Sequence, residues 1–102
     1  MSPDWRQRFR TWIDRVTSGA DAAGVFPCPC CECLTLIELG DYELCPVCFW
    51  EDDPYQSADP ELVDGANGYS LVSARESYAA IGSSHPIYAR RVRGPRPTEL
   101  PT

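Results

Sequence analysis

The sequence contains no lysine, a single histidine and no long run of apolar residues. Charged side chains interrupt every apolar stretch near the start of the chain, at Arg6, Arg8, Arg10, Asp14 and Arg15. We therefore expect no signal peptide, no membrane span and a cytoplasmic location. With 102 residues the chain also lacks the length for a second folded domain, so a single domain with a thin core is expected.

Basic residues are absent from the middle of the chain. The nine basic residues, all arginine, lie in 1–15 and 75–102, whereas 16–74 holds eleven acidic residues and no base. Nucleic-acid phosphates require a positive surface, so the acidic middle weighs against nucleic-acid binding. It favours a basic protein partner, because complementary charge speeds encounter. A basic patch near the C-terminus keeps nucleic-acid binding as an alternative; its members are Arg90, Arg91, Arg93 and Arg96.

Six cysteines fall within 28–48, and four of them repeat one phrase, Cys-Pro-x-Cys. Two thiolates three positions apart on a tight turn can face one ion at about 2.3 Å, and the proline fixes the backbone for that turn. Clustered thiols in a cytoplasmic chain indicate metal binding or redox chemistry before disulfides. We predict a structural Zn²⁺ site of four cysteines, which are Cys28, Cys31, Cys45 and Cys48.

The choice of the first cysteine pair is not unique. Cys30 and Cys33 are also three apart and could replace Cys28 and Cys31, although only the latter pair has proline after its first cysteine. We expect Cys30 to be a spare thiol and Cys33 a buried small apolar residue. Iron in place of zinc, or a thiol redox activity at the two spare cysteines, are the alternatives.

The pattern of the chain predicts a small α+β fold, with a metal-stabilised, zinc-ribbon-like β-hairpin flanked by two helices. The hairpin strands are expected at 35–39 and 42–45, around a turn at Gly40-Asp41. One helix is expected over 2–18 and the other between Ser70 and Gly82. The first helix carries an apolar stripe at helical spacing, formed by Trp5, Phe9, Trp12, Ile13 and Val16. Residues 51–69 should be a loop with at most a turn of helix, and 94–102 should be extended.

Few other residues are candidates for chemistry. His85 has no recognisable partner pattern and is expected at the surface. Glu51-Asp52-Asp53 lacks the spacing of a calcium loop, which favours a solvated acidic loop over a cation site. Residues 64–68 have turn composition, and Trp50 should shield the metal. A closed shell of four thiolates has no open position for substrate, so we expect no enzyme.

Several short segments together carry a resemblance to a known family. They are Phe26-Pro27-Cys28-Pro29-Cys30-Cys31, Thr35-Leu36, the run from Tyr42 to Asp53, Gly65-Ala66-Asn67-Gly68, Ser70-Leu71 and Ala74-Arg75. Over residues 26–82 the chain resembles the bacterial cysteine-rich CPCC family. The resemblance implies a metal-binding module without a catalytic mechanism, and some members occur near toxin systems, which implies an immunity role. Two departures from the family pattern are Glu32, where glycine is expected, and the additional Cys33.

These observations predict one domain over 1–102, divided into an N-terminal amphipathic helix at 1–19, a zinc-binding module at 26–82 and an extended tail at 94–102. The predicted function is that of a non-enzymatic bacterial zinc-binding protein that recognises a protein partner, such as a basic toxin, through its acidic surface.

Overall fold

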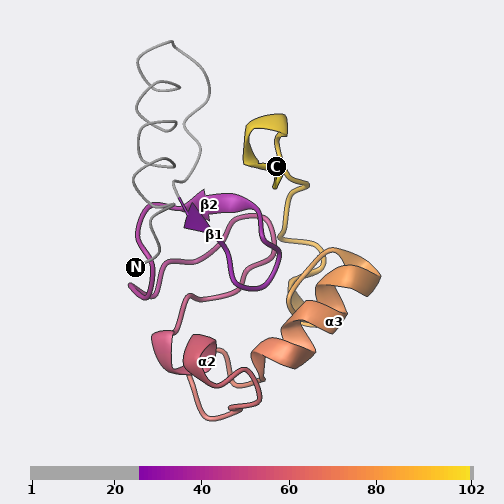
Figure 1. Ribbon diagram of the computed structural model, residues 1–102. Helices are drawn as coiled ribbons and strands as arrows, with labels where there is room; N and C mark the ends of the chain where they lie inside the picture. The colour runs from indigo at the N-terminus through magenta and orange to yellow at the C-terminus, as the bar shows by residue number, and fades with distance from the viewer. Residues whose placement is uncertain (1–25, 102) are drawn as a thin grey trace.

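Two short antiparallel strands lie at the centre of the computed structural model, which describes residues 26–101 (Figure 1). They are β1 (Phe26–Pro27) and β2 (Leu34–Leu36), and Phe26 pairs with Leu36. The chain between them contains the first Cys-Pro-x-Cys phrase. The helix expected over 2–18 and its apolar stripe lie outside the described residues.

The predicted pairing of 35–39 with 42–45 is wrong. The second segment instead runs against the residues that follow the second Cys-Pro-x-Cys phrase, with a bridge between Leu44 and Glu51. The N–H of Tyr42 donates to the carbonyl of Asp52 at 3.0 Å. Each cysteine phrase therefore lies at the tip of its own small hairpin.

The side chain of Glu43 explains why the expected hairpin does not form. Its carboxylate accepts the backbone N–H groups of Ile37 and Glu38, at 2.9 and 3.2 Å. A carboxylate that accepts two backbone donors makes strong, charge-assisted hydrogen bonds. These donors are then not available for a strand ladder between the two segments.

The two described α-helices are α2 (Pro54–Ala58) and α3 (Leu71–Ile81). The expected second helix is confirmed at both ends. Ser70 caps it by accepting the N–H of Ser73, and Gly82 follows it in the left-handed conformation, with φ of 78°. The short α2 agrees with the single turn expected within 51–69. Neither α2 nor α3 is long and apolar enough to cross a membrane.

The acidic run after the second cysteine phrase is not a solvated loop, and that prediction is wrong for two of its three residues. Asp52 and Asp53 are buried. An Asp52 oxygen accepts the N–H of Gly40 at 2.6 Å, and the Asp53 oxygens accept the N–H groups of Tyr55 and Ala66 at 2.8 and 3.0 Å. Burial raises the pKa of the Asp52 carboxyl. Both carboxylates hold loops together, because they satisfy backbone donors that have no other partner.

A buried amide organises the loop between α2 and α3. Gln56 is fully buried, and its Nε2 donates to the carbonyls of Leu62 and Tyr69 at 2.9 and 2.8 Å. Its Oε1 accepts from Asn67 Nδ2 at 2.7 Å. A Cβ on Gly65 would lie 2.5 Å from the side chain of Gln56, so this turn requires glycine. The turn composition of 64–68 therefore serves a closely packed polar core.

The C-terminal segment is not wholly extended, contrary to the prediction for 94–102. It contains a single 3-10 turn, η2 (Pro97–Glu99), which packs against β2, and a similar turn, η1 (Pro86–Tyr88), precedes it. Glu99 is buried and accepts from both terminal nitrogens of Arg93 at 2.7 Å. This bidentate pair anchors the tail, because a charged group out of water requires such partners.

The Glu99 anchor predicts a pH-dependent contribution to stability. The Arg93 hydrogen bonds lower the pKa of Glu99 below its usual value of 4.5. Because the pKa of Glu99 is lower in the folded than in the unfolded state, the ionised carboxylate stabilises the fold fully above the unfolded-state pKa. This contribution disappears as the pH falls through the folded-state pKa. Glu99→Gln should therefore cost about 1–2 kcal/mol at pH 7. Urea unfolding of both proteins between pH 7 and pH 3 should show the difference shrinking below about pH 4.5. A difference that is constant with pH would contradict this account.

Candidate metal centre

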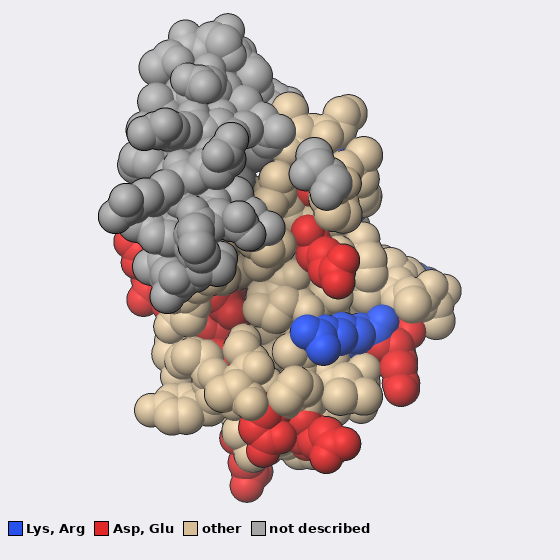
Figure 2. All heavy atoms as spheres, viewed as in Figure 1, with Lys and Arg blue, Asp and Glu red and all other residues tan. Residues whose placement is uncertain are grey.

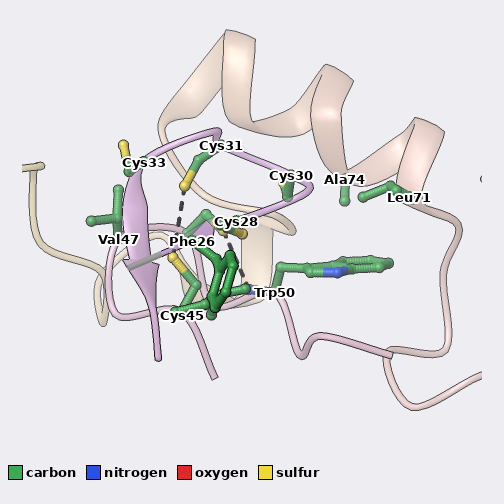
Figure 3. Close-up of a cluster of buried hydrophobic side chains, with 12 residues drawn as sticks. Phe26, Cys28, Cys30, Cys31, Cys33, Cys45, Val47, Trp50, Leu71 and Ala74 are labelled. Atoms are coloured by element: carbon green, nitrogen blue, oxygen red, sulfur yellow. Dashed lines mark hydrogen bonds between the residues drawn. The ribbon is translucent and has the colours of Figure 1, made fainter. Parts of the chain in front are cut away.

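Four thiols from the two cysteine phrases meet in the interior (Figure 3). Cys28 Sγ lies 3.6 Å from Cys48 Sγ, and Cys31 Sγ lies 3.7 Å from Cys45 Sγ. All four sulfur atoms lie within 4.8 Å of one another. These distances exclude disulfides, in which the sulfur atoms are about 2.05 Å apart. The exposed fractions are 1%, 0% and 0% for Cys28, Cys45 and Cys48, and 8% for Cys31, so the group is closed to solvent on nearly all sides.

The two turns that present these thiols have the same backbone hydrogen bonds. In the first, the N–H of Glu32 donates to the carbonyl of Cys28 at 2.8 Å, and in the second the N–H of Phe49 donates to that of Cys45 at 2.8 Å. The N–H of each leading cysteine donates to the carbonyl five residues later, which belongs to Cys33 or Trp50. The repeated phrase therefore produces two equivalent turns.

Both turns end on a residue in the left-handed region. Glu32 has φ of 66° and Phe49 has φ of 67°. The left-handed conformation costs a residue with a Cβ roughly 1–2 kcal/mol, and glycine adopts it freely. This geometry explains why glycine is expected at position 32.

Replacing Glu32 by glycine is expected to stabilise the protein by about 0.5–1 kcal/mol, which is the relief of strain less the entropy of glycine in the unfolded chain. Glu32 is exposed, so no packing is lost. The midpoint of urea unfolding of the metal-loaded protein measures the change. Glu32→Ala is the matched control, because it removes the same side chain and keeps the strain. Equal midpoints for the two variants would contradict the explanation.

The sulfur positions fit a tetrahedral metal site. With metal–sulfur bonds of about 2.3 Å, the sulfur atoms of a tetrahedron lie about 3.8 Å apart, close to the observed 3.6 and 3.7 Å. Neighbouring groups supply further hydrogen bonds to sulfur. Thr35 Oγ1 lies 3.1 Å from Cys45 Sγ, and the N–H of Trp50 donates to Cys48 Sγ at 3.4 Å. Hydrogen bonds within the group lower the pKa of the Cys45 thiol and raise the pKa of the Cys31 and Cys48 thiols, so Cys45 is the thiol that ionises first. The four cysteines can therefore hold a metal ion.

The two other cysteines are buried but lie outside this group. Cys30 and Cys33 are 5% and 2% exposed, and the sulfur of Cys33 points away from the cluster in Figure 3. Burial raises the pKa of the Cys33 thiol, so it stays neutral. The structure thus brings Cys28 and Cys31, and not Cys30 and Cys33, to the second pair. Cys33 is buried, as predicted.

One buried indole and one arginine connect the cysteine turns to α3. The indole of Trp50 is fully buried beside Leu71 and Ala74 of α3 (Figure 3), and its role in shielding a metal stays a prediction. Arg75, also on α3, donates from Nε to the carbonyl of Pro29 at 2.9 Å, so the helix is tied to the first cysteine turn. No pattern in the sequence predicts these roles of Arg75 and Thr35. Their presence in the segments that carry the family resemblance was the available signal.

His85 and the exposed acidic residues are not members of the four-sulfur group. The imidazole is half-buried, accepts the N–H of Ile87 at 3.2 Å, and has its ring centre 4.9 Å from that of Tyr69. Figure 2 shows acidic side chains on several parts of one face and little basic surface. The exposed acidic residues in the described part of the chain are Glu32, Glu38, Asp41, Asp59, Glu61, Asp64 and Glu76.

Comparison with known proteins agrees with the cysteine geometry. The model of the family described as cysteine-rich CPCC matches residues 26–99, well over half of the chain. The match includes both cysteine turns, α3 and the buried Glu99. A search among curated proteins found no match. The chain therefore belongs to the cysteine-rich CPCC family.

Proposed function

We propose that the four thiolates bind one Zn²⁺ as a structural ion and that the protein is a non-enzymatic module that recognises a basic protein partner. The observation that carries the metal assignment is the buried group of four sulfur atoms, which lie within 4.8 Å of one another and include two pairs at 3.6 and 3.7 Å. An all-thiolate site uses every coordination position of a tetrahedral ion, so substrate or water has no place on the metal.

The small apolar core supports a structural role for the ion. Of the twelve buried apolar residues in 26–101, six are cysteines, so much of the interior of this part of the chain consists of thiols. A metal that joins the two turns then supplies stability that a core of this size lacks. Thiolate tetrahedra also suit iron, and the identity of the metal is the first quantity to measure.

Metal analysis of the protein as purified tests the zinc assignment. We expect one zinc per chain, no colour, and no more than two titratable thiols in the folded protein, those of Cys30 and Cys33. A red chromophore and one iron per chain would instead indicate an iron site for electron transfer. Six titratable thiols without bound metal would overturn the structural site altogether.

The acidic surface supports the recognition role. Asp59, Glu61 and Asp64 are exposed within one short loop after α2. The ion pair in residues 26–101 joins Arg93 to Glu99, on the C-terminal segment, so these three carboxylates are not paired with a base there. Free carboxylates close together attract a cationic surface and raise the rate of its association. A toxin with a basic active site is a partner of this kind.

Charge reversal in this loop tests the recognition role. The partner to test is a basic protein, and any toxin encoded beside the gene for this chain is the first to try. The triple variant Asp59→Lys, Glu61→Lys, Asp64→Lys should lose binding and cell protection, and the loss should be largest at low salt. Glu76→Lys, an exposed acid on α3, is the matched control. Failure of the unmodified protein to bind or protect would contradict this role and leave the metal site untouched.

A further inference from the structure

An exposed apolar surface lies on the loop that follows β2. Ile37, Leu39, Tyr42 and Leu44 are 60%, 48%, 45% and 54% exposed, within eight consecutive residues. We call these four residues the loop patch. Isolated exposed apolar residues are common, but four within one short segment make this loop a surface that another element could cover.

The register of the strands places Phe26 beside the start of this loop. Phe26, the first residue that the structure describes, pairs with Leu36, which directly precedes Ile37. The connection over 20–25 spans at most about 20 Å when fully extended. A segment that ends at Gly19 therefore lies within reach of the loop patch.

The segment before this connection has the complementary composition. The helix expected over 2–18 carries the stripe of Trp5, Phe9, Trp12, Ile13 and Val16 on an arc of about 100°. Aromatic side chains of this kind bury about 150–250 Å² each when they pack. A helix of this length is marginal alone in water, so it depends on packing for its stability.

The charges beside the two apolar surfaces are opposite. At about 100° per residue, Arg6 and Arg8 fall on the two sides of the stripe in the expected helix. The loop patch has the exposed acids Glu38 and Asp41 within it. We propose that residues 2–18 dock as a helix on the loop patch of the same chain, with the aromatic stripe on the apolar side chains and the arginines beside these acids.

Tryptophan fluorescence and hydrogen exchange of the full-length, metal-loaded protein test the proposal. Leu39→Ser removes one contact from the loop patch, and the docking equilibrium should fall about tenfold. The emission of Trp5 and Trp12 should shift to the red and their quenching by acrylamide should rise, while the fully buried Trp50 serves as a constant reference. The amides of 5–16 should lose exchange protection to the same extent.

Ile81→Ser on α3 is the matched control, because Ile81 has the same 48% exposure as Leu39. It should leave both signals unchanged. The reciprocal variant Trp12→Ser should move the amide chemical shifts of 37–44, whereas Gln7→Ser, on the far side of the expected helix, should not. Equal signals in Leu39→Ser and Ile81→Ser would overturn the proposal. Protection that depends on protein concentration would also overturn it, in favour of docking on a second copy.

Discussion

Replacing Cys45 by serine is expected to abolish metal binding and to unfold the domain. Cys45 is fully buried, its Sγ lies 3.7 Å from that of Cys31, and Thr35 contacts it at 3.1 Å. Structural zinc sites contribute about 10–16 kcal/mol of apparent binding energy, which equals or exceeds the net stability of a small domain. Loss of one of four ligands should therefore leave no stable fold. Zinc content after gel filtration and far-ultraviolet circular dichroism measure the two effects.

Cys30→Ser provides the matched control for this variant. It makes the same chemical change at a residue that is 5% exposed and lies outside the four-sulfur group. We expect it to retain one metal per chain and to lose at most about 1–3 kcal/mol, as for other buried substitutions. Chelation of the unmodified protein should reproduce the unfolding of Cys45→Ser. A Cys45→Ser protein with full metal content and an unchanged melting temperature would contradict the predicted ligand set.

The cysteine cluster was predictable because its geometry is local. Each pair of thiols is set by one turn of four residues, and proline after the leading cysteine restricts that turn. The proline after the leading cysteine also favoured Cys28 and Cys31 as the first pair, and in the structure these two thiols lie with Cys45 and Cys48. The bounds of α3 were predictable for the same reason, since Ser70 and Gly82 act on adjacent backbone groups.

The strand pairing was not predictable from alternating apolar residues. Residues 35–39 and 42–45 both have strand composition, but Glu43 accepts the N–H groups of Ile37 and Glu38. The burial of Asp52 and Asp53 likewise depends on backbone donors that are distant in sequence, at Gly40 and Ala66. Composition cannot reveal such partners, because the same acidic residue can lie in water or in a polar core, depending on which backbone donors the fold brings to it.

The equivalence of the two cysteine turns gives Trp50 its special position. Cys33 and Trp50 stand at the same place in the two turns, since the carbonyl of each accepts the N–H of its leading cysteine. One turn is thus followed by a small thiol and the other by the largest fully buried side chain in 26–101. The indole extends from the cysteine group to Leu71 and Ala74, and joins that group to α3 (Figure 3).

Trp50→Ala is therefore expected to lower the free energy of unfolding by about 3–5 kcal/mol, the usual cost of a large cavity in a core. The indole is fully buried and meets the ring of Tyr69 edge-on, at 5.9 Å between ring centres. The N–H of residue 50, which donates to Cys48 Sγ, is retained in alanine, so metal should still bind. Urea unfolding of the loaded protein measures the loss, and transfer of the metal to a chelator should become faster.

Two variants separate the role of Trp50 from a general effect of losing an aromatic ring. Tyr55→Ala removes a ring that is 70% exposed and should change stability by less than about 0.5 kcal/mol. Trp50→Phe should cost less than Trp50→Ala, because it fills most of the cavity and removes the indole N–H, a buried donor without a hydrogen-bond partner among the described residues. If Trp50→Ala were as stable as Tyr55→Ala, the indole would not be what holds α3 to the cysteine group. The connection left intact in that variant is the hydrogen bond from Arg75 to the carbonyl of Pro29, which would then hold the helix.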